Sequence, residues 1–451
     1  MSPTFQALSN RNYRLYAAGG IVSNVGTWMQ RVAQDWLVLQ LTDGSGTAIG
    51  VTTGLQFLPM LLLSPLGGLV ADRMSKRRLL QITQLSMGTV SLLLGVLAVS
   101  GVAQPWHVYV LAFVFGVATA FDSPARQSFV SEMVGPDDLT NAVGLNSASF
   151  NTARIIGPAV AGLLIAAFGS GPRATGWVIL LNAVSYLPVI YALRRMDPRE
   201  LDTPKPARAG RGMIRAGVGY VRRRPDIMLV MTVVFFAGTF GLNFQVTSAL
   251  MATHVFHKGA GEYGLLGSTM AIGSLAGALL AARRTNPTSR LVVIAAVLFG
   301  AAEIVAGLLP TYWSFMAWTP LLGLSALTMI TSANATVQLA AAPEFRGRVM
   351  ALYLMVFMGG TPIGSPIIGW VGENLGARWT LILGGLLTIL GVLGAVAAFG
   401  WRRAHSEPAL RTAASRSVVA DGDTSARRVA VDIGHKPART VGIGHNPAPP
   451  A

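Results

Sequence analysis

Twelve apolar stretches, each long enough to cross a lipid bilayer, recur along the chain and constrain its fold more than any other feature. A spanning helix needs about 20 mostly apolar residues. Because lipid offers no partner to backbone N–H and C=O groups, continuous runs of this length form helices, whereas barrel strands are short and alternating. We therefore predict an all-α membrane protein. In chain order, the twelve predicted transmembrane helices (spans one to twelve) occupy residues 15–41, 48–71, 79–102, 106–127, 143–168, 175–193, 227–253, 263–282, 291–309, 313–337, 349–371 and 379–401.

Composition agrees with lipid as the solvent. Charged residues make up only 12% of the 451 residues and hydrophobic ones 52%, whereas a soluble domain carries about 25% charged residues. This balance excludes a soluble globular enzyme and a disordered chain. The chain has no cysteine, which also excludes disulfides, structural zinc and thiol catalysis. His254 and His257 have no evident third ligand apart from Glu262, so we predict no metal and no cofactor.

Basic residues, which give the chain a formal net charge of +16, gather in alternate loops. When the N-terminus is placed inside, the opposite loops hold only Arg173, Lys258 and Arg378. Loops rich in Lys and Arg stay on the cytoplasmic side of a membrane, so we predict that both termini are cytoplasmic. The positive charge is then a topology signal, and we predict no nucleic-acid partner.

One long connection, rich in Arg, Pro and Gly, divides the spans six and six. We predict an N-terminal six-helix half at 1–193, a basic cytoplasmic linker at 194–226 and a C-terminal six-helix half at 227–401. The remaining residues, 402–451, contain few aromatic side chains and are predicted to form a disordered cytoplasmic tail. Contact with a lipid headgroup or a partner is the alternative role of this tail.

The two halves show a faint internal repeat. Sliding the chain by 207 residues pairs Gly116 with Gly323 and Gly157 with Gly364, in equivalent spans of the two halves. Two six-helix repeats related by an axis along the membrane normal form a transporter architecture. The repeat therefore favours a transporter over a channel or a membrane enzyme.

The loop between spans two and three carries a motif: Gly68, three residues, Asp72-Arg73, and then a short basic run with Lys76 and Arg77. Gly68 would let two helices approach closely, and Asp72 could meet a helix N-terminus, whose dipole favours an anion. The motif resembles the signature loop of the major facilitator superfamily, which implies a cytoplasmic gate. The alternative is a basic topology loop with an incidental acid.

Span five contains a series of small residues, Gly144, Gly157-Pro158 and Gly162. Their spacing resembles the motif of the superfamily's antiporters. Small residues permit tight helix packing, and the proline bends the helix. The resemblance favours export over uptake, and generic small-residue packing is the alternative.

Four further segments, 26–30, 36–39, 121–127 and 151–158, look like the bacterial branch of enterobactin exporters and macrolide-efflux-type pumps. This resemblance extends over residues 10–401. It implies the major facilitator fold, with twelve helices in two six-helix pseudo-repeats and with spans one, four, seven and ten lining a central cavity. It also implies a monomer in a bacterial plasma membrane.

Charged residues inside spans are costly unless they are paired or hydrated. Arg31 and Asp35 are four residues apart in span one and so share a helix face, and Arg154 lies near the middle of span five. Asp35 is a candidate proton site, where Arg31 or Arg154 would favour the charged form of its carboxyl group. The alternative is a permanent ion pair between Asp35 and one of these arginines, which would only orient helices. Arg154 is expected to tune Asp35 or to hold an anionic group of a substrate.

Asp122 and Arg126 are four residues apart near the cytoplasmic end of span four. We favour a cytoplasmic latch in which they join Asp72, Arg73 and Arg77, with substrate binding as the alternative.

Aromatic and amide side chains on the cavity spans suit bulky amphiphilic ligands, although buried helix contacts would look similar. Glu303, the only charge inside peripheral span nine, is expected to pair with a neighbour or to be partly exposed, and a coupling role is the alternative. The predicted cavity residues are Trp28, Trp36, Phe240, Asn243, Gln245, Asn334 and Gln338.

No catalytic or ATP-binding motif is present: none of the four lysines follows a glycine, as a phosphate-binding loop requires. We predict a secondary transporter, not an enzyme, that rocks its two halves about a midplane site. Its expected partners are the lipid bilayer, protons and a small amphiphilic substrate, such as a drug or a siderophore-like metabolite, which it exports by antiport. An uptake permease or facilitator of the same fold and a non-transporting scaffold or sensor are the alternatives.

Overall fold

The computed structural model describes residues 3–202, 213–282 and 288–400, which are helical apart from short connections. Most chain turns are made by a proline at the start of the next helix or by a residue with positive φ, such as Gly101. The first six long helices are α1 (Arg11–Leu41), α2 (Gly46–Arg73), α3 (Lys76–Ser100), α4 (Pro105–Met133), α5 (Pro136–Ala167) and α6 (Pro172–Arg195). The later helices are α7 (Met213–Arg222), α8 (Pro225–Phe236), α9 (Phe244–Leu250), α10 (Ala260–Ala282), α11 (Ser289–Leu308), α12 (Tyr312–Ala340), α13 (Arg346–Asn374) and α14 (Ala377–Ala395).

Eleven helical segments within the described ranges are long and apolar enough to cross a membrane. The one predicted span missing from these eleven is span one, α1, which is less apolar because it carries Gln30, Arg31, Gln34 and Asp35 in its interior. Its 31 residues still extend about 46 Å, more than the hydrocarbon core requires. The predicted all-α fold with twelve spans is confirmed, and its first span is the polar one.

Span seven, predicted as one continuous helix over 227–253, is broken. A π-helical turn at Ala237–Gly241 follows α8, and α9 begins only after two non-helical residues. The Asn243 side chain forms two hydrogen bonds at the break. Its Nδ2 donates to the Thr239 carbonyl oxygen at 2.8 Å, and its Oδ1 accepts from Ser365 Oγ at 2.8 Å. Discontinuous helices occur at the binding sites of transporters.

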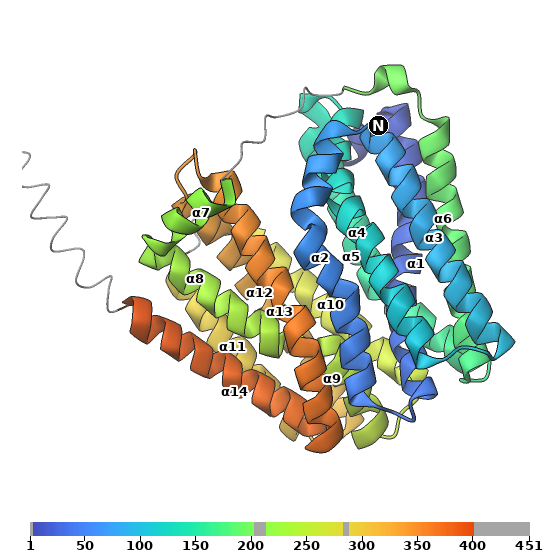
Figure 1. Ribbon diagram of the computed structural model, residues 1–451, viewed down its shortest axis with the longest axis vertical. Helices are drawn as coiled ribbons and strands as arrows, with labels where there is room; N and C mark the ends of the chain where they lie inside the picture. The colour runs from blue at the N-terminus through green and yellow to red at the C-terminus, as the bar shows by residue number, and fades with distance from the viewer. Residues whose placement is uncertain (1–2, 203–212, 283–287, 401–451) are drawn as a thin grey trace, which may run out of the picture. The chain divides into compact units, whose positions relative to one another are not determined.

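The helices of the N-terminal half meet those of the C-terminal half closely along α2 and α13, which lie side by side in Figure 1. A Cβ atom on Gly46 would lie 2.6 Å from the Gly369 carbonyl oxygen, and one on Gly50 would lie 2.3 Å from the Ser365 carbonyl oxygen. Glycine is therefore needed for these helices to touch. These approaches lie at the ends of α2 and α13 that are remote from the basic loops, and we call this the closed end.

Part of the predicted basic linker is helical. Within 194–226, α7 packs on α13, where a Cβ atom on Gly217 would lie 3.2 Å from Cβ of Arg348. Residues 203–212 of the linker and the predicted tail at 402–451 lie outside the described residues. The residues from α1 to α14 pack as one compact unit.

Candidate functional site

A cavity of ≈ 330 Å³ lies among helices from both halves. Spans one and seven line it as expected, and span ten adds only Ile330. Span four, which the family resemblance places at the cavity, contributes no side chain among the described lining residues, and spans two, five, eight and eleven take part instead. Most of the lining is apolar, and its larger apolar side chains are Trp28, Val32, Phe57, Leu242, Phe244, Met270, Phe357 and Met358.

Of the predicted cavity residues, Trp28 and Gln245 line the cavity. Trp36 is buried beneath it and stacks on Tyr263, with ring centroids 6.1 Å apart and planes 21° apart. Helical position alone does not fix which face of a helix meets a cavity. The described lining of this cavity does not include five of the predicted residues, Trp36, Phe240, Asn243, Asn334 and Gln338, and their contact with a substrate stays a prediction.

Asp35 is buried, with 3% of its surface exposed, and its partner comes from the other half of the protein. The Tyr263 hydroxyl, on α10, donates to Asp35 Oδ2 at 2.9 Å. Within the described parts of the chain, no ion pair joins Asp35 to Arg31 or Arg154. The alternative of a permanent Asp35–arginine pair is therefore not what the structure contains. No pattern in the sequence pointed to Tyr263.

Arg31 and Arg154 both line the cavity, and several of their nitrogen atoms have no partner. The guanidinium carbon of Arg31 lies 4.6 Å from the Trp28 ring centroid and 5.7 Å from that of Phe57. The Nε atoms of both arginines and Nη2 of Arg154 are buried without a hydrogen-bond partner in the described structure. The cavity thus carries two positive charges whose hydrogen-bonding capacity is not used up.

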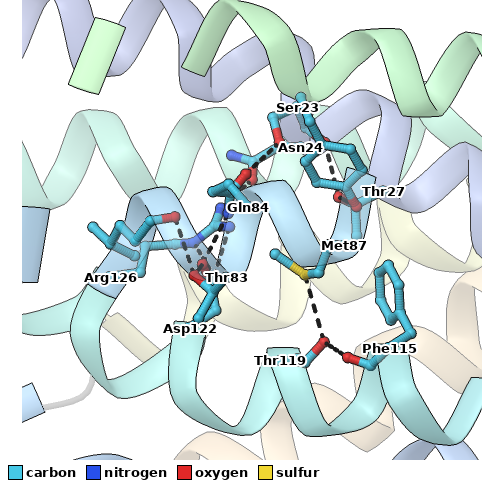
Figure 2. Close-up of polar contacts among 12 residues, drawn as sticks. Ser23, Asn24, Thr27, Thr83, Gln84, Met87, Phe115, Thr119, Asp122 and Arg126 are labelled. Atoms are coloured by element: carbon cyan, nitrogen blue, oxygen red, sulfur yellow. Dashed lines mark hydrogen bonds and ion pairs between the residues drawn. The ribbon is translucent and has the colours of Figure 1, made fainter. Parts of the chain in front are cut away.

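Asp122 and Arg126 form a closed polar network with α1 and α3 (Figure 2). Asp122 Oδ2 accepts from Arg126 Nε at 2.9 Å and lies 2.7 Å from Arg126 Nη2. Asp122 Oδ1 accepts from Thr83 Oγ1 and from Gln84 Nε2, both at 2.8 Å. Arg126 Nη1 donates to Asn24 Oδ1 at 2.9 Å. This network cross-links three helices of the first half and does not border the cavity.

The predicted latch residues do not form one cluster in this structure. Asp72 and Arg73 are exposed at the end of α2. Lys76 makes a buried ion pair with Glu132 of α4, and Arg77 donates to backbone carbonyls at the end of α6. Lys76 and Arg77 thus bond to groups within the first half. The latch is expected only while the cytoplasmic end is closed, so it stays a prediction. Glu132 was missed because it lies near a helix end, where acids are common.

Two of the predicted packing glycines face open space. Apart from the helix's own neighbouring residues, no described atom lies within 4 Å of a Cβ built on Gly68 or on Gly144. The close contact of α2 with α4 occurs one residue earlier, where a Cβ atom on Gly67 would lie 2.3 Å from the Ala120 carbonyl oxygen. A shift of one residue turns a helical side chain by about 100°, so the motif marks the right turn of helix but the wrong face.

The rest of the span-five motif lies at interhelix contacts. A Cβ atom on Gly157 would lie 2.6 Å from Cβ of Trp28, on α1. One on Gly162 would lie 2.4 Å from the Ala260 carbonyl oxygen, on α10, and the Pro158 carbonyl oxygen lies close to Gly264 of the same helix. This stretch of α5 therefore joins α1 of the first half to α10 of the second.

Glu303 is buried, and it forms no ion pair with any residue that the structure describes. It has 3% of its surface exposed, and its Oε2 has no hydrogen-bond partner in the described residues. A Cβ atom on Gly241, in the break of span seven, would lie 2.9 Å from this oxygen. The acid therefore points at the broken helix, which the sequence had given no reason to expect.

Comparison with known protein families identifies the group to which these features belong. A family model described as "Transmembrane secretion effector" matches residues 2–428. The chain belongs to this family. It is accordingly a membrane-embedded transporter of the major facilitator superfamily rather than an enzyme, as the motifs predicted.

Relatives of this transmembrane secretion effector include a staphyloferrin A transporter of Staphylococcus aureus, 25% identical over 81% of this chain and 90% of its own length. A macrolide efflux protein A of Streptococcus pyogenes is 23% identical over 82% of this chain and 92% of its own. A multidrug efflux pump, Tap, of Mycolicibacterium fortuitum is 26% identical over 85% of this chain and 94% of its own length.

Solved structures share the fold at low sequence identity. A bacterial homologue of the human lysosomal transporter Spinster matches with a TM-score of 0.66 at 14% identity, covering 89% of this chain and 96% of its own. A D-xylose–proton symporter matches with a TM-score of 0.65 at 12% identity, and the match covers 85% of this chain and 96% of the symporter. These matches confirm the major facilitator fold.

Proposed function

We propose that this transmembrane secretion effector is a proton-coupled exporter of small amphiphilic molecules that works as a monomer in a bacterial plasma membrane. The observation that carries the proposal is a cavity between the two halves, next to a buried acid whose only hydrogen-bond partner in the described structure belongs to the opposite half. Two of the relatives named above are efflux proteins, which favours export as the direction.

Alternating access follows from where the halves touch. The glycine-dependent contacts of α2 with α13 lie at the closed end, whereas Asp72 of α2 and Arg346 of α13 are exposed at the other end. Since basic loops stay in the cytoplasm, this end is cytoplasmic, as are both termini. The arrangement corresponds to the conformation in which an exporter loads its substrate, and rocking the halves would move the opening outward.

Asp35 supplies the coupling. An ionised carboxylate only accepts hydrogen bonds, whereas a protonated one also donates. Protonation of Asp35 therefore changes the bond that Tyr263 makes across the two halves. A charge change at a contact between two rigid bodies shifts the balance between their arrangements.

The first prediction tests this role. Asp35→Asn preserves size and hydrogen bonding but removes titration. In inside-out vesicles with an acidic lumen, we expect the parent to accumulate members of a panel of anionic, neutral and cationic fluorescent dyes, and the variant to lose the gradient-driven part while still binding the same dyes. Asp43→Asn, on an exposed loop, is the matched control.

Unchanged pH-driven flux in Asp35→Asn would remove the proton role from Asp35. Accumulation by right-side-out vesicles in place of inside-out ones would assign the protein to uptake.

A further inference from the structure

We infer that the cavity binds an anionic amphiphile, whose carboxylate is held by Arg31 and Arg154 (the arginine pair). The inference deepens the proposed transport function and rests on it. It is carried by geometry: two guanidinium groups from α1 and α5 face one cavity, with buried nitrogen atoms that no described residue engages.

The charges around the arginine pair leave an excess of positive charge. Tyr263 is the only other titratable side chain in the described lining, and its hydroxyl is committed to Asp35. Asp35 lies on the same helix as Arg31, four residues further along, and it is buried outside the lining. The two arginines repel one another, and guanidinium groups do not give up their protons in proteins.

An uncompensated guanidinium group is expensive in a membrane interior. A protein that needed these arginines only for packing would place acceptors beside them, as it does for Arg126. An anion in the cavity would supply the missing acceptors and neutralise one of the two charges, leaving Asp35 to balance the other.

The chemistry of the guanidinium group determines which anion fits best. The Arg31 guanidinium carbon lies beside two aromatic rings, those of Trp28 and Phe57, which offer it no hydrogen-bond acceptor oxygen. The planar donor fork of a guanidinium group matches a carboxylate, which it binds bidentately. A quaternary or primary ammonium group would meet positive charge in the same place.

The remaining lining accommodates the apolar part of the ligand. Phe244, Met270, Phe357 and Met358 surround the cavity on the side of the second half. Methionine adapts to varied shapes, and ≈ 330 Å³ is within the range of small-molecule sites. The substrate class is therefore a carboxylate, or an anion of similar shape, on an aromatic or aliphatic body.

The test uses three probes with the same ring system and different charge: naphthoate, its neutral amide naphthamide, and naphthylmethylammonium. Binding is measured by titration calorimetry on the full chain in nanodiscs of phosphatidylcholine. We expect the parent to bind naphthoate at least about ten-fold more tightly than naphthamide, as a charged hydrogen-bonded pair warrants, and to bind the ammonium probe most weakly.

Three variants assign that preference to the arginine pair. Arg154→Met should weaken naphthoate binding by about ten- to a hundred-fold and change naphthamide binding little. Arg154→Lys should recover part of the loss, because it restores charge but not the fork. Arg173→Met, at an exposed position outside the cavity, should behave as the parent does.

Equal affinity for naphthoate and naphthamide in the parent, or unchanged naphthoate binding in Arg154→Met, would overturn the inference. Loss of naphthoate binding when phosphatidylglycerol is added to the nanodiscs would assign the arginine pair to a lipid headgroup and overturn the substrate assignment. Binding in nanodiscs requires no transport, so the charge preference stands or falls separately from the vesicle experiment on proton-driven flux.

Discussion

Two arginines in the first half, Arg126 and Arg154, are both enclosed by helices, yet their surroundings are opposite. Arg126 is bonded to Asp122 and Asn24, and Asp122 is bonded in turn to Thr83 and Gln84, so nearly every polar atom in Figure 2 has a partner. Arg154 has two buried nitrogen atoms with none in the described structure. The difference separates a side chain that holds helices together from one that is ready to receive a ligand.

The energetics of buried charge make this comparison measurable. Removing one member of a buried ion pair costs about 3–5 kcal/mol, because the other member is left charged and unpaired. Replacing a charged group that has no partner by an apolar one of similar size carries no such penalty and can stabilise the protein. Stability and ligand binding should therefore respond in opposite ways at the two sites.

The largest effect is expected at the closed network. Asp122→Ala removes a buried carboxylate that Arg126, Thr83 and Gln84 share, and we expect the free energy of unfolding to fall by about 3–5 kcal/mol. Thermal unfolding of the purified protein in detergent, followed by circular dichroism, measures the loss. Glu344→Ala, at an exposed site, is the control, and Arg154→Met should unfold no earlier than the parent.

If Asp122→Ala were as stable as the parent and failed only in transport, the network would belong to the substrate path or the gate, and the contrast with Arg154 would disappear.

A smaller loss is expected at Lys76, which the sequence assigned to a latch and the structure pairs with Glu132. Lys76→Met should cost about 3 kcal/mol, the low end for a broken buried pair, because the Lys76 ammonium group has Glu132 as its one described partner, whereas Asp122 also bonds to Thr83 and Gln84. The double variant Lys76→Met/Glu132→Leu should recover most of it, since it removes both charges. Failure of the double variant to recover would mean that Glu132 has partners beyond Lys76.

The class of the fold and the charged residues of the cavity could be predicted from the sequence, because the length of an apolar run and a charge within it are visible in a short stretch of chain. Arg31 and Arg154, which stand out in the sequence as charges inside spans, both line the cavity. The bond between Tyr263 and Asp35 joins residues 228 positions apart, and nothing in a single sequence records such a contact.

The sequence also did not predict which face of a helix contacts its neighbour. Gly67 and Gly68 differ by one position, yet only Gly67 meets α4 closely. The break in span seven was also hidden, since Gly241 and Asn243 lie within a run that stays apolar on both sides. An isolated glycine is tolerated inside a helix, so its presence in a helical pattern does not show where the helix breaks.

The smallest effect is expected at Asp72, the exposed counterpart of these buried groups. We propose that Asp72 meets Arg346 or Arg348 when the cytoplasmic end closes and separates from them when it opens; the open arrangement is the one in this structure, with Asp72 and Arg346 both exposed. An exposed ion pair contributes about 0–1 kcal/mol. Asp72→Asn should therefore shift the populations of the two arrangements by no more than about five-fold and leave the unfolding temperature unchanged.

The absence of cysteine from the chain allows this shift to be measured directly. Spin labels at Ser75→Cys and Gly347→Cys report the distance between the cytoplasmic ends of α2 and α13, and both sites are exposed. Asp72→Asn should enlarge the long-distance population relative to the parent, because only the closed arrangement loses a contact. A folded variant with the parent's distance distribution would leave Asp72 as part of a topology signal, and the stabilising role of charge would then be confined to the buried pairs.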